Sequence, residues 1–167
     1  MGSYRLAAEA TLATGEKATA AWTIVVPDRP LPPDGLIEVP APALTLAGRS
    51  GTVTGWAGSG CYIYLCVDVG RLPPLRTLPH LDVTSGEPLT ARLDDGSGIA
   101  AWKVTLYPIV SGVQSAMDEI GDEPTSAIEA FTVTAPAAGD WLMQTEVSYD
   151  RLRGWTHTFY HLTARQR

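Results

Sequence analysis

The sequence is poor in several residue types, and each shortage excludes a class of protein. Its 167 residues contain no asparagine, two lysines and two cysteines, and 18% of them are charged. This charged fraction is too low, and the apolar fraction of 45% too high, for a disordered chain. No apolar run approaches the roughly 18 residues of a membrane span, and the N-terminus lacks the basic-then-apolar layout of a secretory signal. We therefore expect one globular chain, made and kept in a cytoplasm.

The charge of the chain is acidic and unevenly distributed. The formal net charge is −6, which argues against non-specific binding to nucleic acid because such binding needs Lys and Arg to displace counterions. Residues 145–167 carry four arginines against two acids, so this segment is basic and the remainder acidic. Opposite poles on one molecule suit head-to-tail packing of identical copies.

Both cysteines lie in the strand-like stretch CYIYLCVDV, at Cys61 and Cys66. If this stretch is one extended strand, their Cα atoms stand roughly 16 Å apart and point to opposite faces, beyond disulfide reach. The sequence therefore predicts two free thiols that act as small buried hydrophobic residues.

Hydrophobic residues alternate with polar ones in short stretches separated by Gly, Pro, Asp and Ser, which predicts an all-β chain. We expect an antiparallel β-sandwich, Ig-like or jelly-roll-like, of about eight to ten strands. The expected strands are 4–12, 17–26, 44–48, 51–58, 61–69, 89–93, 99–110, 127–134, 140–149 and 154–164. The acidic run 115–123 is expected to be an exposed loop.

We expect a single domain over residues 1–167, with 1–26 forming an N-terminal hairpin and 27–42 a Pro-rich connector. A lone two-stranded hairpin is marginally stable in water. The hairpin must therefore pack on the core of the remaining chain, which we expect, or on a neighbouring subunit.

The sequence has no signature of catalysis, cofactor binding or metal binding. On a strand, His157 and His161 share one face with their Cα atoms roughly 13 Å apart, too far to ligate one ion. His80 does not complete a ligand set, and the turn Asp94–Gly98 is interpreted as a hairpin turn because it lacks the distal Glu of a calcium loop. We expect no catalytic, cofactor or metal residues and no enzyme activity; a hydrolase with converging carboxylates is a third, weaker interpretation.

Aromatic side chains are the remaining candidates for function. The chain has five tryptophans and six tyrosines, and Tyr62 and Tyr64 fall on the second face of the expected strand 61–69, where they are suited to an interface. The expected contact residues are these two tyrosines and arginines of one copy that face acids of another, namely Arg151, Arg153, Arg165 and Arg167 against Asp118, Glu119, Asp122 and Glu123.

Two stretches, YRLAAEATLATGEKATAAWTIVVPD with the connector after it and TARLDDGSGIAAWKVTLYP, resemble accessory virion proteins of bacteriophages. The likeness is to β-sandwich domains of minor tail, fibre-attachment and capsid-decoration proteins, and the turn Leu93-Asp94-Asp95-Gly96 is part of it. The resemblance implies a structural component of a virion, assembled in the host cytoplasm from many copies and without cofactors.

The leading hypothesis from the sequence is thus a non-enzymatic phage virion component. Its partners would be other virion proteins and copies of itself, with no nucleic acid and no membrane. The alternative is a carbohydrate-binding module or adhesin domain, in which exposed tryptophans stack on the sugar rings of a host glycan.

Overall fold

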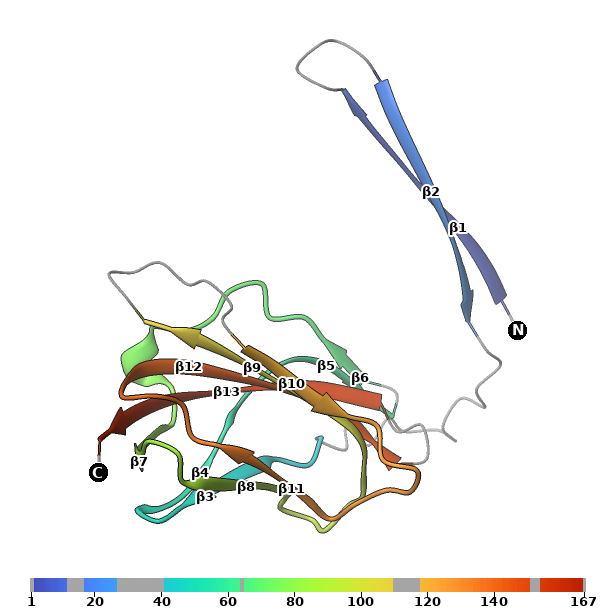
Figure 1. Cartoon of the computed structure of the whole chain (residues 1–167). Coiled ribbons are helices and arrows are strands. Elements are labelled where there is room, and N and C mark those ends of the chain that lie inside the picture. The colour runs from blue at the N-terminus through green and yellow to red at the C-terminus, as the bar shows by residue number, and fades with distance from the viewer. Residues whose placement is uncertain are drawn as a thin grey trace. The chain divides into compact units, whose positions relative to one another are not determined.

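The computed structural model describes residues 2–11, 17–26, 41–63, 65–109, 118–150 and 154–166, and the chain divides into two compact units, Met1–Ile37 and Glu38–Arg167. In the first unit, β1 (Gly2–Thr11) and β2 (Lys17–Val26) form an antiparallel hairpin, in register from Gly2 opposite Val26 to Thr11 opposite Lys17 (Figure 1). This strand pair is the one expected from the sequence. Its packing against a core stays a prediction, and residues 27–40 of the connector lie outside the described residues.

The second unit is built from two β-sheets that lie face to face in Figure 1. The larger sheet has the order β10 (Asp118–Asp122), β9 (Ile99–Pro108), β12 (Gly139–Tyr149), β13 (Gly154–Arg165), β5 (Trp56–Tyr62), β6 (Leu65–Val67), and β7 (His80–Thr84) pairs in parallel with β13. The smaller sheet has the order β11 (Ala130–Thr134), β8 (Pro88–Leu93), β3 (Leu44–Gly48), β4 (Gly51–Thr54). The described residues contain no α-helix and one complete 3-10 turn, η1 (Leu75–Thr77). The all-β prediction is confirmed.

The core fills the space between the two sheets, and strands such as β7, β8 and β11 contribute to it by burying every second residue. In β8, for example, Leu89, Ala91 and Leu93 are buried while the intervening residues face outward. Trp102 of the larger sheet stacks on Phe131 of the smaller one, with ring centroids 4.3 Å apart. The Tyr160 hydroxyl donates a hydrogen bond of 2.8 Å to the Leu44 carbonyl across the same layer. Stacking and hydrogen bonding thus fix the two sheets against each other.

The expected strand 61–69 does not exist as one strand. The chain turns back at Ile63, whose φ is 53°, so β5 and β6 form a tight antiparallel hairpin with Cys61 opposite Cys66. Their Cα atoms are 4.0 Å apart and the two sulfurs are bonded. The prediction of two free thiols is wrong because it assumed an unbroken strand.

Two further predictions of local structure are wrong. Within the acidic run 115–123, Asp118–Asp122 form strand β10, which pairs with β9 at the edge of the larger sheet. The turn Asp94–Gly98 is not a hairpin turn, because it joins β8 of one sheet to β9 of the other. Asp94 Oδ1 accepts a 2.9 Å hydrogen bond from the Ala43 amide at this crossing.

The outer face of the larger sheet carries a second, smaller apolar cluster. Leu78, which precedes β7, is buried together with Leu142 of β12 and Phe159 of β13. Trp56, Leu72, Leu75, Tyr107 and Ile109 pack around these three side chains. The outer face is therefore covered near Phe159, and residues on either side of this cluster form separate surfaces.

Candidate functional site

Strand β13 places a row of ring side chains on the outer face of the larger sheet. Its inward residues, such as Tyr160 and Leu162, belong to the core, so alternation directs Trp155, His157, Phe159 and His161 outward. Phe159 is covered by the smaller apolar cluster. The row therefore has an accessible end at Trp155 and His157 and a polar end at His161.

Trp155 is one of the few large apolar side chains that the described part of the chain exposes, with 36% of its surface accessible. Its ring lies beside that of His157, with centroids 4.9 Å apart. Across the strands, Trp155 is opposite Ser148 of β12 on one side and Cys61 of β5 on the other. The cross-strand disulfide thus flanks the tryptophan.

A groove of about 590 Å³ lies next to this aromatic pair, over β9, β10 and β12. Lys103 belongs to its lining, and the Lys103 Nζ atom is 3.7 Å from Glu119 and 3.8 Å from Glu146. The Glu146 carboxylate also lies 3.3 Å from the Nε2 atom of His157, which links the groove to β13. The groove is lined by Ala101, Trp102, Lys103, Glu119, Gly121, Asp122, Glu123, Glu146 and Ser148.

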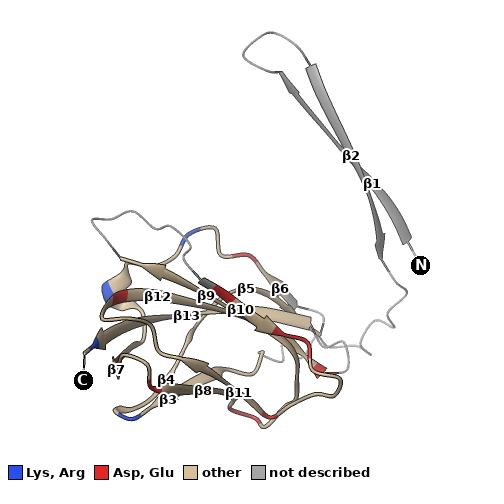
Figure 2. Cartoon of the chain, in the orientation of Figure 1, with Lys and Arg blue, Asp and Glu red and all other residues tan. Residues whose placement is uncertain are grey.

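The groove is acidic, since four carboxylates and one ammonium group line it. Figure 2 shows the acidic residues of β10 and of the segment that follows it along this side of the sheet. We refer to Trp155, His157 and the residues that line the groove together as the Trp155 surface. Its polar and aromatic groups include the exposed Trp155 indole, the His157 imidazole, four carboxylates, the Lys103 ammonium group and the Ser148 hydroxyl.

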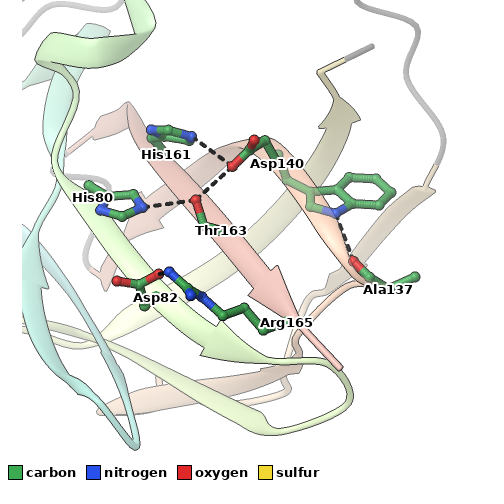
Figure 3. A network of polar contacts seen from close by, with 8 residues as sticks. His80, Asp82, Ala137, Asp140, His161, Thr163 and Arg165 are labelled. Atoms are coloured by element: carbon green, nitrogen blue, oxygen red, sulfur yellow. Dashed lines mark hydrogen bonds and ion pairs between the residues drawn. The ribbon is translucent and has the colours of Figure 1, made fainter. Parts of the chain in front are cut away.

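The polar end of the row forms a network around the Asp140 carboxylate (Figure 3). The Thr163 hydroxyl donates a 2.6 Å hydrogen bond to Asp140 and lies 3.0 Å from His80 Nε2, while His161 Nε2 is 3.4 Å from the same carboxylate. The hydrogen bond from Thr163 is the main cause that lowers the pKa of Asp140 below its ordinary value of 3.8. Together with the 3.1 Å ion pair between Arg165 and Asp82, these contacts join β7 to the main sheet.

The network does not supply a metal site. Among the residues that the structure describes, no three His, Cys, Asp or Glu side chains converge so that they could hold a metal ion.

A membrane-spanning helix is also not found among the described residues, since none of their helices combines the length and the apolarity that a span requires.

The contact residues expected from the sequence are scattered by the fold. Tyr62 is buried, with 6% of its surface accessible and its ring edge-on to Tyr149 at 4.9 Å, so it is not a surface residue. Arg165 is exposed and pairs with Asp82 of the same chain. Glu119, Asp122 and Glu123 are exposed and line the groove. Tyr64, Arg151, Arg153, Arg167 and the side chain of Asp118 lie outside the described residues, and the pairing of these arginines and acids between copies stays a prediction.

Sequence reasoning missed the combination of Trp155 with Glu146, Lys103 and Ser148. The sequence does contain one signal, because alternation along 154–164 places Trp155 on the face shared by His157 and His161. Which strands flank β13, and therefore which polar residues surround Trp155, depends on the sheet order.

No protein-family model matches the chain, and no curated protein matches it. Two solved structures match parts of the chain. One is the structure of T. fusca AA10A, with 14% identity, a TM-score of 0.38, and 53% of each chain covered. The other is a polysaccharide monooxygenase, CBM33, with 11% identity, a TM-score of 0.37, and coverage of 55% of this chain and 63% of that one. The aligned region is thus less than two thirds of this chain and of each matched chain.

These comparisons correct the functional interpretation of the sequence. Neither matched structure is described as a virion protein, and one is described as a polysaccharide monooxygenase. The predictions of a phage structural component and of a chain without enzyme activity are therefore contradicted. At such low similarity, the function of this chain has to be argued from its own residues.

Proposed function

We propose that the protein binds polysaccharide through the Trp155 surface. The observation that carries this proposal is an exposed indole beside a groove lined by carboxylates and a hydroxyl. An aromatic ring offers a flat apolar platform for the C–H face of a sugar ring. Fixed polar groups around such a platform set the orientation and the specificity of a ligand.

The polar side chains are suited to sugar hydroxyls, which both donate and accept hydrogen bonds. Glu146 and Glu119 accept, Lys103 donates, and Lys103 lies within 4 Å of both carboxylates. A saccharide stacked on Trp155 would lie near Glu146 of the neighbouring strand β12. Lys103 of β9 and Glu119 of β10 follow farther along the same sheet.

The negative charge of the groove determines whether a neutral or an anionic saccharide can bind there. Four carboxylates against one lysine repel a polyanion, since like charges brought together cost free energy. We therefore propose a neutral polysaccharide as the ligand and exclude sulfated or uronic acid-rich chains from this surface.

The disulfide supports a role outside a reducing compartment. Disulfides persist in extracellular and other oxidising spaces and are rare where thiols are kept reduced, and the two cysteines of this chain are joined to each other. Extracellular polysaccharide is a target consistent with such a location.

The first test is co-sedimentation of the full chain with insoluble cellulose and chitin, as neutral polysaccharides, and with heparin beads as the anionic comparison. We expect binding to a neutral polysaccharide and none to heparin. Trp155→Ala should weaken that binding about tenfold or more, a loss of about 1.4 kcal/mol.

The matched control is Val67→Ala, which truncates another exposed apolar side chain, 48% accessible, on the edge strand β6. It should bind like the unaltered protein. Equal binding by Trp155→Ala and the unaltered protein would refute the proposal, as would retention on heparin with no retention on either neutral polysaccharide.

A further inference from the structure

The Trp155 surface has two parts that lie side by side on the sheet. Ser148 and Glu146 line the groove, and in the register of β12 with β13 they are opposite Trp155 and His157. Side chains opposite each other on antiparallel strands share a face and have Cβ atoms about 5 Å apart. Trp155 itself does not line the groove, so a sugar ring stacked on the indole leaves the groove beside it open.

The groove continues from these two residues across the sheet, strand by strand. Ser148 is opposite Ala101 of β9, and Glu146 is opposite Lys103 of the same strand. Lys103 is in turn opposite Gly121 of β10. All five residues line the groove. The lining therefore crosses the strands, from β12 over β9 to β10, and begins next to Trp155 on β13.

The distance across these strands exceeds the length of a small sugar. Neighbouring strands lie about 4.8 Å apart, so the three intervals from β13 to β10 span about 14 Å. The two linked rings of a disaccharide are shorter than this distance. The groove volume of about 590 Å³ is in the range of pockets that hold whole ligands. The groove thus has room for the further rings of a chain whose first ring lies on Trp155.

Gly121 keeps the β10 end of this path free of a side chain. A Cβ atom at this position would lie 2.7 Å from the carbonyl oxygen of Trp102. A larger residue would therefore have to displace the backbone of β9. Glycine is required by the close packing of the edge strand, and only backbone lines the groove at this point.

A ligand cannot extend along β13 toward its C-terminal end. Phe159 is the next outward residue after His157, and the smaller apolar cluster buries it. Thr105 of β9 belongs to the same row as Phe159, through Gln144 of β12, and is also buried. A chain that begins on Trp155 is therefore directed across the strands and into the groove.

The charged groups along this path are accessible to a ligand. The accessible fractions of the Glu146, Lys103 and Glu119 side chains are 38%, 43% and 62%. The Lys103 Nζ atom lies within 4 Å of both carboxylates, so an acceptor, a donor and a second acceptor follow one another from β12 to β10. Successive sugar rings present hydroxyls that both donate and accept, and each ring can bond to the groups that it passes.

We infer that the Trp155 surface binds an extended segment of a polysaccharide, laid across the strands with one ring on Trp155 and the following rings in the groove as far as Glu119. This inference rests on the proposed function and adds the length and the direction of the bound segment. A single sugar would occupy the indole and leave Lys103 and Glu119 without a ligand. Affinity should therefore increase with the number of linked rings.

The inference is tested by NMR titration of the ¹⁵N-labelled full chain with saccharides of increasing length. The ligands are glucose, cellobiose and cellotetraose, and the monomer, dimer and tetramer of N-acetylglucosamine. In at least one series we expect Kd to fall at least tenfold from the disaccharide to the tetrasaccharide. The disaccharide should shift the amides of Trp155 and His157, whereas the tetrasaccharide should also shift those of Lys103, Glu119 and Gly121.

Glu119→Ala removes a contact at the end of the path that is farthest from Trp155. It should raise the Kd of the tetrasaccharide about tenfold, as expected for the loss of a hydrogen bond to a charged group, and leave the Kd of the disaccharide unchanged. The matched control is Glu129→Ala, at an exposed glutamate that does not line the groove, and it should bind both ligands normally. Trp155→Ala should weaken the binding of both.

Three results would overturn the inference: equal Kd values for the disaccharide and the tetrasaccharide, tetrasaccharide shifts that spare Lys103, Glu119 and Gly121, or normal tetrasaccharide binding by Glu119→Ala. In each case, co-sedimentation that depends on Trp155 would still support the proposed function. Failed co-sedimentation together with the absence of any oligosaccharide binding would instead refute the proposed function, and the inference with it.

Discussion

Two buried tyrosines show how single residues hold the sandwich together. The Tyr149 hydroxyl lies 2.6 Å from the Thr156 hydroxyl and 3.3 Å from the Pro42 carbonyl. Tyr160 donates to the Leu44 carbonyl of the opposite sheet. Burial raises the pKa of Tyr149 to about 12 and raises the pKa of Tyr160 as well, because an apolar layer disfavours a phenolate. Both residues therefore make the fold sensitive to alkali.

We predict that the free energy of unfolding falls as the pH rises from 10 to 12. The folded pKa of Tyr149, about 12, is above its ordinary value of 10. The stability from its neutral form is therefore complete below pH 10 and is lost as the pH rises through 12. Tyr149→Phe cannot ionise, so its stability should fall less steeply over this range, although it starts about 1 kcal/mol lower because its hydrogen bonds are lost.

Urea unfolding at several pH values between neutral and alkaline measures this difference. The control is Tyr107→Phe, because the Tyr107 hydroxyl makes only a 3.4 Å contact, with Gln144. It should retain the alkaline slope of the unaltered protein. Identical slopes for Tyr149→Phe and the unaltered protein would show that Tyr149 does not contribute to the alkaline loss of stability.

At the scale of elements, the β5–β6 hairpin depends on its disulfide. Strand β6 has three residues and lies at the edge of the larger sheet, so few backbone hydrogen bonds hold it. The bond from Cys61 to Cys66 closes a short loop. A cross-link of this span stabilises by about 2 kcal/mol, since it restricts the unfolded chain.

We predict that the native protein contains no free thiol and that Cys61→Ala combined with Cys66→Ala lowers the free energy of unfolding by about 2 kcal/mol. Thiol titration under denaturing conditions, before and after reduction, checks the first part, and urea unfolding checks the second. The unaltered protein in the presence of a reductant should unfold like the double variant. Two titratable thiols before reduction would contradict this prediction.

Sequence periodicity predicts strands well and their partners poorly. The ranges 140–149 and 154–164 are close to β12 and β13 because alternation there is regular over many residues. The stretch 61–69 also alternates, but its turn at Ile63 contains neither glycine nor proline, so no local signal separates β5 from β6. The acidic run around Asp118–Asp122 is a strand because β9 offers it an open edge, a property of the sheet and not of the run.

The same limit applies to the candidate site. Alternation predicts that His157 and His161 share a face with Phe159. It does not predict that His80 from a parallel strand reaches His161, with ring centroids 4.7 Å apart, or that Glu87 is buried beside the β3–β4 turn. Those contacts join residues far apart in the sequence, and only the sheet order brings them together.

At the scale of the whole molecule, the second unit contains a complete two-layer core. Its main cluster takes buried residues from both sheets, from Leu44 of β3 to Ala164 of β13. The first unit is a two-stranded hairpin, a structure that is marginally stable by itself in water. The two units therefore differ in how far each can fold independently.

We predict that residues 38–167 fold without the first unit. Because the second unit has its own core, the shortened chain should keep the near-ultraviolet circular dichroism of its buried aromatic residues. Its unfolding in urea should remain a single cooperative transition, as expected of a small unit with its own core. Urea unfolding of both chains makes the comparison. A fragment that lacks the aromatic signal, or that is several kcal/mol less stable, would instead mean that the hairpin completes the core, the packing that the sequence predicts.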